Sequence, residues 1–369
     1  MVYLDNAATS FPKPGVVYKA VQECIKTYCG NPGRSLHRLA RRAGEEIFEA
    51  RAAIARFFGS EHPERVVFTQ NATHALNLAI KTAIPKNSGV LISDVEHNAV
   101  YRPLKAEEER RGLSVMRFSS DGDVEKNLKA GLTARTRAVV STIRSNVTGA
   151  RIPLALLSDF ARREGLLLII DGSQSAGHEK IDLSKTPCDV FCAPGHKGLF
   201  GIQGSGFALF RDDIPRESFI EGGSGSESRS VGMPRNLPER FEAGTLPTPS
   251  IVALRRGIEW IERYGIDRIE KELERLTEEA KYALNEIDRI VFLQGEGGIL
   301  SFRIKDEDPA RTAERLDRLG ICVRSGLHCA PLAHEKFGTV ETGTVRVSFS
   351  ALNRERDIAR LADALKGGK

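Results

Sequence analysis

Short apolar segments alternate with longer stretches of helical periodicity over the first two thirds of the chain. Several of the short segments are apolar at every position, which is typical of strands covered on both faces. Six of them predict β-strands: Val66–Thr69, Val90–Ser93, Ala138–Thr142, Leu166–Ile170, Val190–Ala193 and Phe207–Phe210. The stretches between them include three predicted helices, Thr73–Ala83, Val100–Arg110 and Pro153–Arg163. This alternation predicts an α/β fold with a doubly wound, mostly parallel sheet.

The pattern changes after Pro249. From Ile251 to about Ile287 the apolar positions follow one long helical periodicity, and short strands, a helix and a final strand and helix come after it. We therefore expect a large α/β domain over residues 16–249. A smaller α+β domain would combine residues 1–15 with residues 250–369.

Composition narrows the classes of function. The chain has 54 Lys and Arg against 49 Asp and Glu, a net charge of +5 in which both signs are mixed, so we expect no nucleic-acid partner. The longest apolar run, Gly165–Ile170, is too short to cross a bilayer, and the first residues lack the features of a secretion signal. We expect a cytoplasmic protein without a membrane partner. Its six cysteines include no Cys-x-x-Cys pair, which argues against structural zinc.

Polar residues follow each of the first three predicted strands, at the point where the strand leads into a loop. In open α/β sheets ligands bind beyond the carboxyl ends of the strands. Residues Asn71–Thr73 open a helix whose N-terminus suits a phosphate, His97 follows the second strand, and a turn after the third carries Asn146. Taken singly, an ordinary helix cap, a loop histidine and a turn explain these residues equally well.

Two further sets carry more chemistry. The fourth predicted strand leads into Asp171 and, three residues later, Gln174. A carboxylate in so apolar a setting needs a partner, and a protonated ring nitrogen of a cofactor is a good one. The fifth strand is followed by Pro194-Gly195-His196-Lys197-Gly198. The glycine-rich segment Gly201–Gly206 is close to a dinucleotide-binding fingerprint, but it precedes a strand, so we reject that interpretation.

These motifs resemble the pyridoxal-phosphate site of class V aminotransferase-like, fold-type I enzymes. Asp-x-x-Gln follows a buried strand, and the Lys197 of Gly-His-Lys lies 26 residues beyond Asp171. The resemblance extends from Tyr3-Leu4-Asp5-Asn6-Ala7-Ala8-Thr9 to Arg346-Val347-Ser348. It implies fold-type I architecture, a large sheet domain with a smaller C-terminal domain, and pyridoxal 5'-phosphate as the cofactor.

The resemblance also assigns roles around the cofactor. Lys197 would bond to the cofactor aldehyde, Asp171 would keep the pyridine nitrogen protonated, and Gln174 would reach the ring hydroxyl. The imidazole of His97 would stack on the ring and serve in catalysis, and Asn146 would contact cofactor and substrate. The phosphate would be bound by the remaining members of the set: Ala72, Thr73, His196 and Thr245.

Near the C-terminus, Val323-Arg324-Ser325-Gly326-Leu327-His328-Cys329-Ala330 resembles the cysteine loop of cysteine desulfurases and selenocysteine lyases. Cys329 would then be the nucleophile that accepts sulfur. The short segment from Cys329 to Phe337 is similar to the branch with a compact catalytic loop. Arg346 matches an arginine that binds a substrate α-carboxylate, and Arg324 would assist it. The loop that contains Thr245 matches one that reaches the phosphate of a neighbouring protomer, which implies a homodimer.

Two positions depart from the family pattern. Pro194 stands where a phosphate-binding serine often precedes Gly-His-Lys, so phosphate binding would rely more on Thr73, His196 and Thr245. Asn98 follows His97 where related desulfurases often have a second histidine, which leaves the subfamily open.

The resemblance implies a pyridoxal-phosphate-dependent cysteine desulfurase. L-Cysteine would become L-alanine, and the sulfur would be held as a persulfide on Cys329 for transfer to an acceptor, such as a sulfur-acceptor protein. A selenocysteine lyase with the same site is one alternative, and a class V aminotransferase or epimerase with an incidental Cys329 is another. A catalytically silent member of the fold is a third, which the intact set of Asp171, Gln174 and Lys197 argues against.

Overall fold

The computed structural model describes residues 1–33, 35–212, 217–227 and 229–367. Its centre is a seven-stranded sheet in which β8 alone runs against its neighbours. The strands, in spatial order, are β2 (Val66–Thr69), β8 (Gly206–Phe210), β7 (Val190–Pro194), β6 (Leu167–Asp171), β5 (Thr136–Thr142), β3 (Gly89–Ser93) and β4 (Ser114–Phe118). The mostly parallel sheet and its six predicted strands are confirmed, and β4 is an addition.

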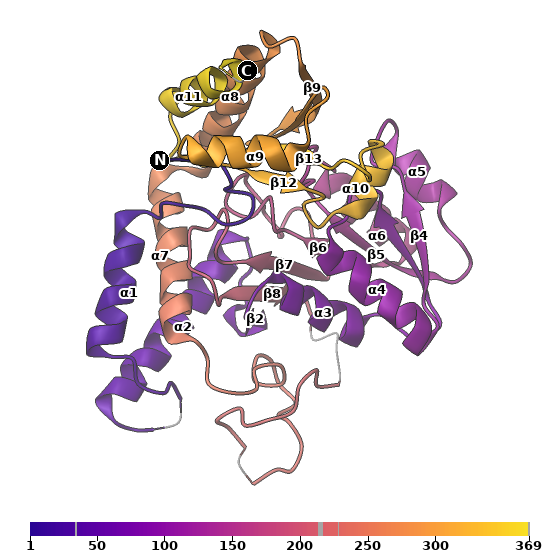
Figure 1. The fold of residues 1–369 in the computed structure, drawn as a ribbon. Helices are drawn as coiled ribbons and strands as arrows, with labels where there is room; N and C mark the ends of the chain where they lie inside the picture. The colour runs from indigo at the N-terminus through magenta and orange to yellow at the C-terminus, as the bar shows by residue number, and fades with distance from the viewer. Residues whose placement is uncertain (34, 213–216, 228, 368–369) are drawn as a thin grey trace.

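Helices cover both faces of this sheet (Figure 1). In β6, Leu168 and Ile170 pack into the core on one face, and Ile169 packs into the core on the other, as the two-residue period of a strand requires. The Ile169 face is covered by α3 (Ala72–Ala83) and α4 (Asn98–Arg111). The opposite face is covered by α2 (Arg38–Phe57), α5 (Val124–Ala130) and α6 (Leu154–Glu164), and a 3-10 turn at Pro63–Arg65 precedes β2. This double cover explains why the central positions of most of these strands are apolar.

The long helical periodicity after Pro249 forms two helices and not one. They are α7 (Thr248–Tyr264) and α8 (Ile266–Asn285), separated by Gly265. Gly265 has φ +98°, a backbone conformation that favours glycine and that a continuous helix cannot contain. The first of the two helices packs against α2 and against α1 (Gly15–Thr27), beside which it lies in Figure 1.

A second, antiparallel sheet follows. Its order is β12 (Arg324–Gly326), β13 (Thr344–Ser348), β10 (Ile299–Ile304) and β9 (Ile290–Glu296). The helices of this part are α9 (Pro309–Arg318), α10 (Pro331–Lys336) and α11 (Glu355–Lys366). The start of the chain joins it, because β1 (Val2–Tyr3) pairs in parallel with β11 (Ile321–Cys322). The division at residues 15/16 and 249/250 stays a prediction.

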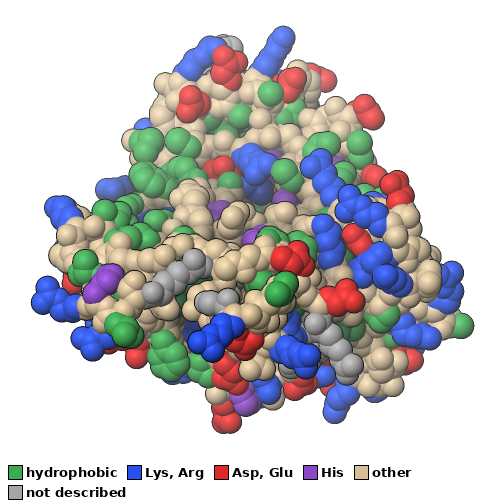
Figure 2. All heavy atoms as spheres, turned by 90° about the horizontal axis from the view of Figure 1, so that it is seen from below, with side chains coloured by type: hydrophobic (Ala, Val, Ile, Leu, Met, Phe, Trp, Pro, Cys, Tyr) green, Lys and Arg blue, Asp and Glu red, His purple; other side chains and the backbone are tan. Residues whose placement is uncertain are grey.

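The turn after β5 meets the second sheet at a close approach. A Cβ added to Gly149 would lie 1.9 Å from the carbonyl oxygen of Glu296, so only glycine fits there. Charged side chains of both signs are interspersed over the face shown in Figure 2. Within the described residues, no helix is both long enough and apolar enough to cross a membrane.

Candidate active site

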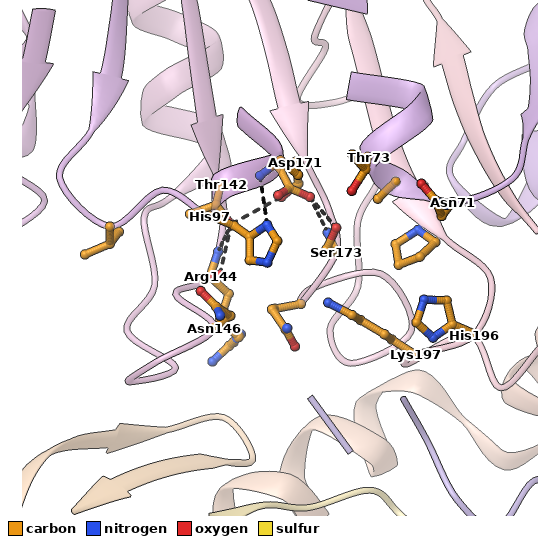
Figure 3. Close-up of a pocket in the computed structure, with 15 residues that line it drawn as sticks. Asn71, Thr73, His97, Thr142, Arg144, Asn146, Asp171, Ser173, His196 and Lys197 are labelled. Carbon is orange, nitrogen blue, oxygen red and sulfur yellow. Dashed lines mark hydrogen bonds between the residues drawn. The ribbon is translucent and has the colours of Figure 1, made fainter. Parts of the chain in front are cut away.

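The carboxyl ends of β5, β6 and β7 and the N-terminus of α3 surround a pocket of about 490 Å³ (Figure 3). Strands that run in parallel end at the same edge, so the topology assembles residues that are far apart in the sequence. Eight of the predicted site residues line the pocket: Ala72, Thr73, His97, Asn146, Asp171, Gln174, His196 and Lys197.

Lys197 lies in the loop after β7, and its side chain extends into the pocket (Figure 3). No described residue forms a hydrogen bond or ion pair with its amine. Burial lowers the pKa of Lys197 to about 8; the carboxylate of Asp171 opposes this shift, and Arg346 adds to it. The neutral fraction of this amine near neutral pH is therefore larger than that of an ordinary lysine, which favours its use as a nucleophile and a base.

Asp171 ends β6 and is 3% exposed. One of its carboxylate oxygens, Oδ1, accepts hydrogen bonds from the backbone N–H of Ser173 (2.9 Å) and from the Ser173 hydroxyl. The other, Oδ2, has no donor among the described residues. Burial raises the pKa of Asp171, and the bonds from Ser173 oppose that shift. A protonated ring nitrogen is a donor that this oxygen lacks.

His97 stands at the start of α4 with its ring at the pocket wall. Its Nδ1 accepts a hydrogen bond from the backbone N–H of Ala99 (2.9 Å), which places the ring proton on Nε2. Burial, reinforced by the positive charge of Lys197, lowers the pKa of His97 to about 3. The ring is therefore neutral at physiological pH and suited to packing against an aromatic group.

The N-terminus of α3 supplies an anion site. The side chain of Asn71 accepts from the backbone N–H of His74 (2.9 Å), whereas the N–H groups of Ala72 and Thr73 have no partner among the described residues. The Nδ1 atom of His196 is buried without a partner and lies at the same pocket. Pro194 also lines the pocket and offers no donor, as the sequence indicated.

Gln174 presents a further orphaned group. Its Nε2 donates to the carbonyl of Ala7 (3.0 Å), and its Oε1 is buried without a partner. The structure thus has an unpaired carboxylate oxygen, an unpaired amide oxygen, an unpaired imidazole nitrogen and two free backbone N–H groups around one cavity. This donor set fits pyridoxal 5'-phosphate, which carries a ring nitrogen, a ring hydroxyl and a phosphate.

Cys329 does not line this pocket, but its loop is fixed to the pocket wall. The backbone N–H of Asn98, next to His97, donates to the carbonyl of Cys329 (2.7 Å). The amide of Asn146 donates to the carbonyl of His328 (2.7 Å). Cys329 is exposed, and Nη2 of Arg324 lies 3.4 Å from its Sγ. The structure therefore places Arg324 against the thiol, beside the site.

Arg346 is 1% exposed and lies on β13. It donates to the carbonyl of Asn146 (2.9 Å) and to Oδ1 of Asp5 (2.8 Å), and its Nε has no partner. Burial lowers the pKa of Arg346, and the carboxylate of Asp5 opposes this shift. A substrate carboxylate would be a second anion at a guanidinium that Asp5 already holds in place.

Thr245 lies outside the pocket. It is exposed, and its hydroxyl accepts a hydrogen bond from Asn31 (3.5 Å). Its loop is anchored through Glu242, which forms a buried ion pair with Arg51 and accepts from the backbone N–H of Phe68 (2.6 Å). Of the four predicted phosphate ligands, Ala72, Thr73 and His196 line the pocket, whereas Thr245 of the same chain does not.

Sequence reasoning gave no role to several residues of the site. Arg144 lines the pocket and forms a buried ion pair with Glu179 (3.0 Å). Ser173 supplies both hydrogen bonds to Asp171. Arg144 lies just beyond the end of β5, as Asp171 lies at the end of β6, so the rule of polar residues at strand ends would have found it. Asp5 was visible only as part of a motif, because its partner is far away in the sequence.

An α/β fold in which an unpaired lysine and an aspartate with a free carboxylate oxygen line one pocket is typical of the class of fold-type I pyridoxal-phosphate enzymes. A family model for class V aminotransferases matches residues 2–361, and the chain belongs to this family. It is 34% identical to a probable cysteine desulfurase of Methanothermobacter thermautotrophicus, covering 99% of this chain and 94% of the relative. It is 32% identical to a probable cysteine desulfurase of Halalkalibacterium halodurans, covering 100% and 93%.

Two solved structures of cysteine desulfurases are also similar to this chain over nearly its full length. The apo cysteine desulfurase of Thermococcus onnurineus NA1 is 29% identical and superposes with a TM-score of 0.89, covering 99% of this chain and 94% of that one. The cysteine desulfurase CsdA of Escherichia coli, in an S-sulfonic acid form, is 26% identical with a TM-score of 0.90, covering 99% and 93%. The resemblance inferred from the motifs and the fold-type I architecture are confirmed.

Proposed function

We propose that the protein is a pyridoxal-phosphate-dependent cysteine desulfurase that converts L-cysteine into L-alanine and retains the sulfur as a persulfide on Cys329. One observation carries the proposal. The loop with the exposed Cys329 thiol is hydrogen-bonded, through Asn98 and Asn146, to the wall of the pocket that contains Lys197 and Asp171. The relatives named cysteine desulfurase support it over the full length of the chain.

The residues around the pocket would hold the cofactor as follows. The free carboxylate oxygen of Asp171 would bind the ring nitrogen and its proton, and the neutral ring of His97 would cover one face. The N–H groups at the start of α3 and the His196 side chain would bind the phosphate. Pyridoxal phosphate held at this site would supply an electron sink that stabilises negative charge at the substrate α-carbon.

The remaining steps belong to the residues of this chain. Arg346, with Asn146 and Arg324, would orient the substrate through its α-carboxylate. The Nζ atom of Lys197, released when the substrate amine replaces it on the cofactor, would take the α-proton, for which a base that titrates near 8 is well matched. The Cys329 thiolate would attack the substrate sulfur: a sulfur–sulfur bond forms, the carbon–sulfur bond breaks with its electron pair left on carbon, and protonation of that carbon gives alanine.

Two features of the assembly belong to the same proposal. Thr245 is exposed and remote from the pocket of its own chain, which supports a homodimer in which it reaches the phosphate site of the partner. The exposure of Cys329 supports transfer of sulfur to an external acceptor, for which a sulfur-acceptor protein is the candidate. We place the protein in the cytoplasm, with no nucleic-acid or membrane partner.

The proposal is tested by incubating the cofactor-loaded protein with L-cysteine and no added thiol. We expect one alanine for each protein chain, and mass spectrometry should find one added sulfur on the peptide that contains Cys329. Turnover that requires a keto acid, without a change in that peptide, would replace the proposal with the aminotransferase alternative. Exclusive use of L-selenocysteine in competition with L-cysteine would replace it with the lyase alternative.

A further inference from the structure

The backbone around Lys197 is held by a short segment from the other end of the molecule. The carbonyl of His196 accepts from the backbone N–H of Ser10 (3.1 Å), the Thr9 hydroxyl (3.0 Å) and Nζ of Lys13 (2.8 Å). The Ser10 hydroxyl donates to the carbonyl of Lys197 (2.8 Å). We call Thr9, Ser10 and Lys13 the N-terminal clamp. The clamp therefore holds the carbonyls of the two peptide units on either side of the Lys197 α-carbon, those of His196 and Lys197.

Lys13 is the unusual member of the clamp. It is 8% exposed, its Nζ bonds only to Ser10 Oγ (2.8 Å) and the His196 carbonyl, and no carboxylate of the described residues pairs with it. Burial lowers its pKa to about 7. A buried amino group without a counter-ion costs stability, and an apolar side chain of similar size would avoid that cost. Stability therefore gives no reason for a lysine at this position.

The hydrogen bonds of the clamp form a chain in one direction. The Ser10 hydroxyl has one hydrogen, and the Lys197 carbonyl (2.8 Å) is a closer acceptor for it than the His196 carbonyl (3.2 Å), so its lone pairs are left to accept from Lys13. Removing the amine of Lys13 would take away one donor to His196 and would also free the Ser10 hydroxyl to rotate. Both peptide units next to Lys197 would be held less rigidly, although the Ser10 N–H and the Thr9 hydroxyl would still donate to the His196 carbonyl.

We propose that Lys13 is a positioning residue for the reaction, which acts by fixing the backbone that presents the Lys197 amine. The inference rests on the proposed function for the choice of L-cysteine as substrate, whereas the contacts of the clamp come from the structure itself. Lys197 has a long flexible side chain with no hydrogen-bond partner at its amine, so its backbone is the main restraint on where Nζ lies. Displacements of about 1 Å at a reacting group can cost about 100-fold in rate.

The test compares Lys13→Met with a matched control, Lys19→Met. Lys19 is an exposed lysine of α1, six residues further along the chain. In Lys13→Met we expect kcat for alanine formation to fall by roughly 10- to 100-fold. The KM for L-cysteine should stay within about threefold, because Arg346 and Asn146 are untouched. Lys19→Met should match the parent in both.

A second measurement does not depend on turnover. Apoprotein is mixed with pyridoxal 5'-phosphate, and capture by Lys197 is followed through the visible absorbance of the bound cofactor. We expect capture by Lys13→Met to be about tenfold slower than capture by Lys19→Met, with an unfolding temperature equal to or above that of the parent. A lower unfolding temperature with parental capture and parental kcat would make Lys13 a structural anchor and overturn the proposal.

If Lys13→Met does not fold, Ser10→Ala tests whether the clamp positions Lys197. It removes the bond to the Lys197 carbonyl and leaves the buried amine in place, and we expect a loss of about 3- to 10-fold in both kcat and capture rate. If kcat and the capture rate of Ser10→Ala equal those of the parent, the positioning role of the clamp is wrong. If the parent itself forms no alanine from L-cysteine, the proposed function fails, while the capture rates still test the clamp.

Discussion

Two cysteines, Cys192 and Cys329, show how the large sheet and the C-terminal loop give one functional group opposite properties. Cys192 lies inside β7 and is fully buried, and burial, reinforced by the charge of Asp171, raises the pKa of its thiol well above the ordinary value. Cys329 is exposed in its loop, with the Arg324 guanidinium 3.4 Å from Sγ. A thiol that exchanges sulfur must reach both a substrate and an acceptor, and Cys329 alone of this pair is accessible.

The contrast extends to the two regions as a whole. The pocket wall is built from strand ends, and its polar groups are fixed by short bonds such as those from Ser173 to Asp171. The cysteine loop is tied down at two backbone carbonyls, and His328 and Cys329 both have left-handed φ values, +50° and +58°. Rigid walls suit charge stabilisation, whereas an accessible loop suits group transfer.

The largest effect is expected on the rigid side of the comparison, from Lys197→Ala. Alanine formation should fall by at least ~1,000-fold, because the chain loses both its cofactor attachment and its base. Borohydride reduction followed by peptide mass spectrometry should fix the cofactor on Lys197 in the parent. Lys180 is exposed, so Lys180→Ala is the control, and the same treatment of this variant should again place the label on Lys197. A label on any other lysine of the parent would contradict the assignment.

The next effect separates the two thiols directly. Cys329→Ala should keep the visible absorbance of the bound cofactor, yet form alanine from L-cysteine about 100-fold more slowly and carry no persulfide, because the thiol whose loop is fixed to the pocket wall is gone. Activity on L-selenocysteine should persist, since the carbon–selenium bond is weaker. Cys192→Ala should keep parental turnover and lose about 1 kcal/mol of stability. Parental alanine release by Cys329→Ala would refute the desulfurase mechanism.

Most strands of the large sheet were predictable because burial on both faces leaves few polar positions in them, mainly at the strand ends. Strand β4 was missed because Ser114 and Arg117 are exposed and interrupt the apolar run. The break at Gly265 was missed because the apolar period continues through it, although the glycine itself was the available signal. Edge positions and single-residue breaks carry little hydrophobic signal.

The site was predictable where chemistry follows a strand end, as at Asp171 and Lys197. The residues of the second sheet, among them Arg346, were assigned by family resemblance alone, because nothing local links them to the pocket. Contacts such as that of Asp5 with Arg346, or of Lys13 with His196, join residues more than 180 positions apart. Only the folded chain reveals such pairs, and they supply much of the preorganisation of the site.

The smallest effect concerns the pH at which the rigid side reacts. Burial lowers the pKa of Lys197 to about 8, and only the neutral amine attacks an aldehyde. Capture of pyridoxal 5'-phosphate by the apoprotein, divided by its capture by the neutral fraction of N-acetyl-lysine amide to remove the titration of the aldehyde itself, reports this fraction. Below pH 8 the capture rate of the apoprotein should fall by about tenfold per pH unit, and above pH 9 it should be level, whereas an ordinary lysine would still be gaining rate at pH 10. Asp171→Asn removes a carboxylate that holds this pKa up, so its midpoint should move to lower pH. A midpoint near 10 in the parent, or a rise in Asp171→Asn, would show that the pocket does not desolvate the Lys197 amine.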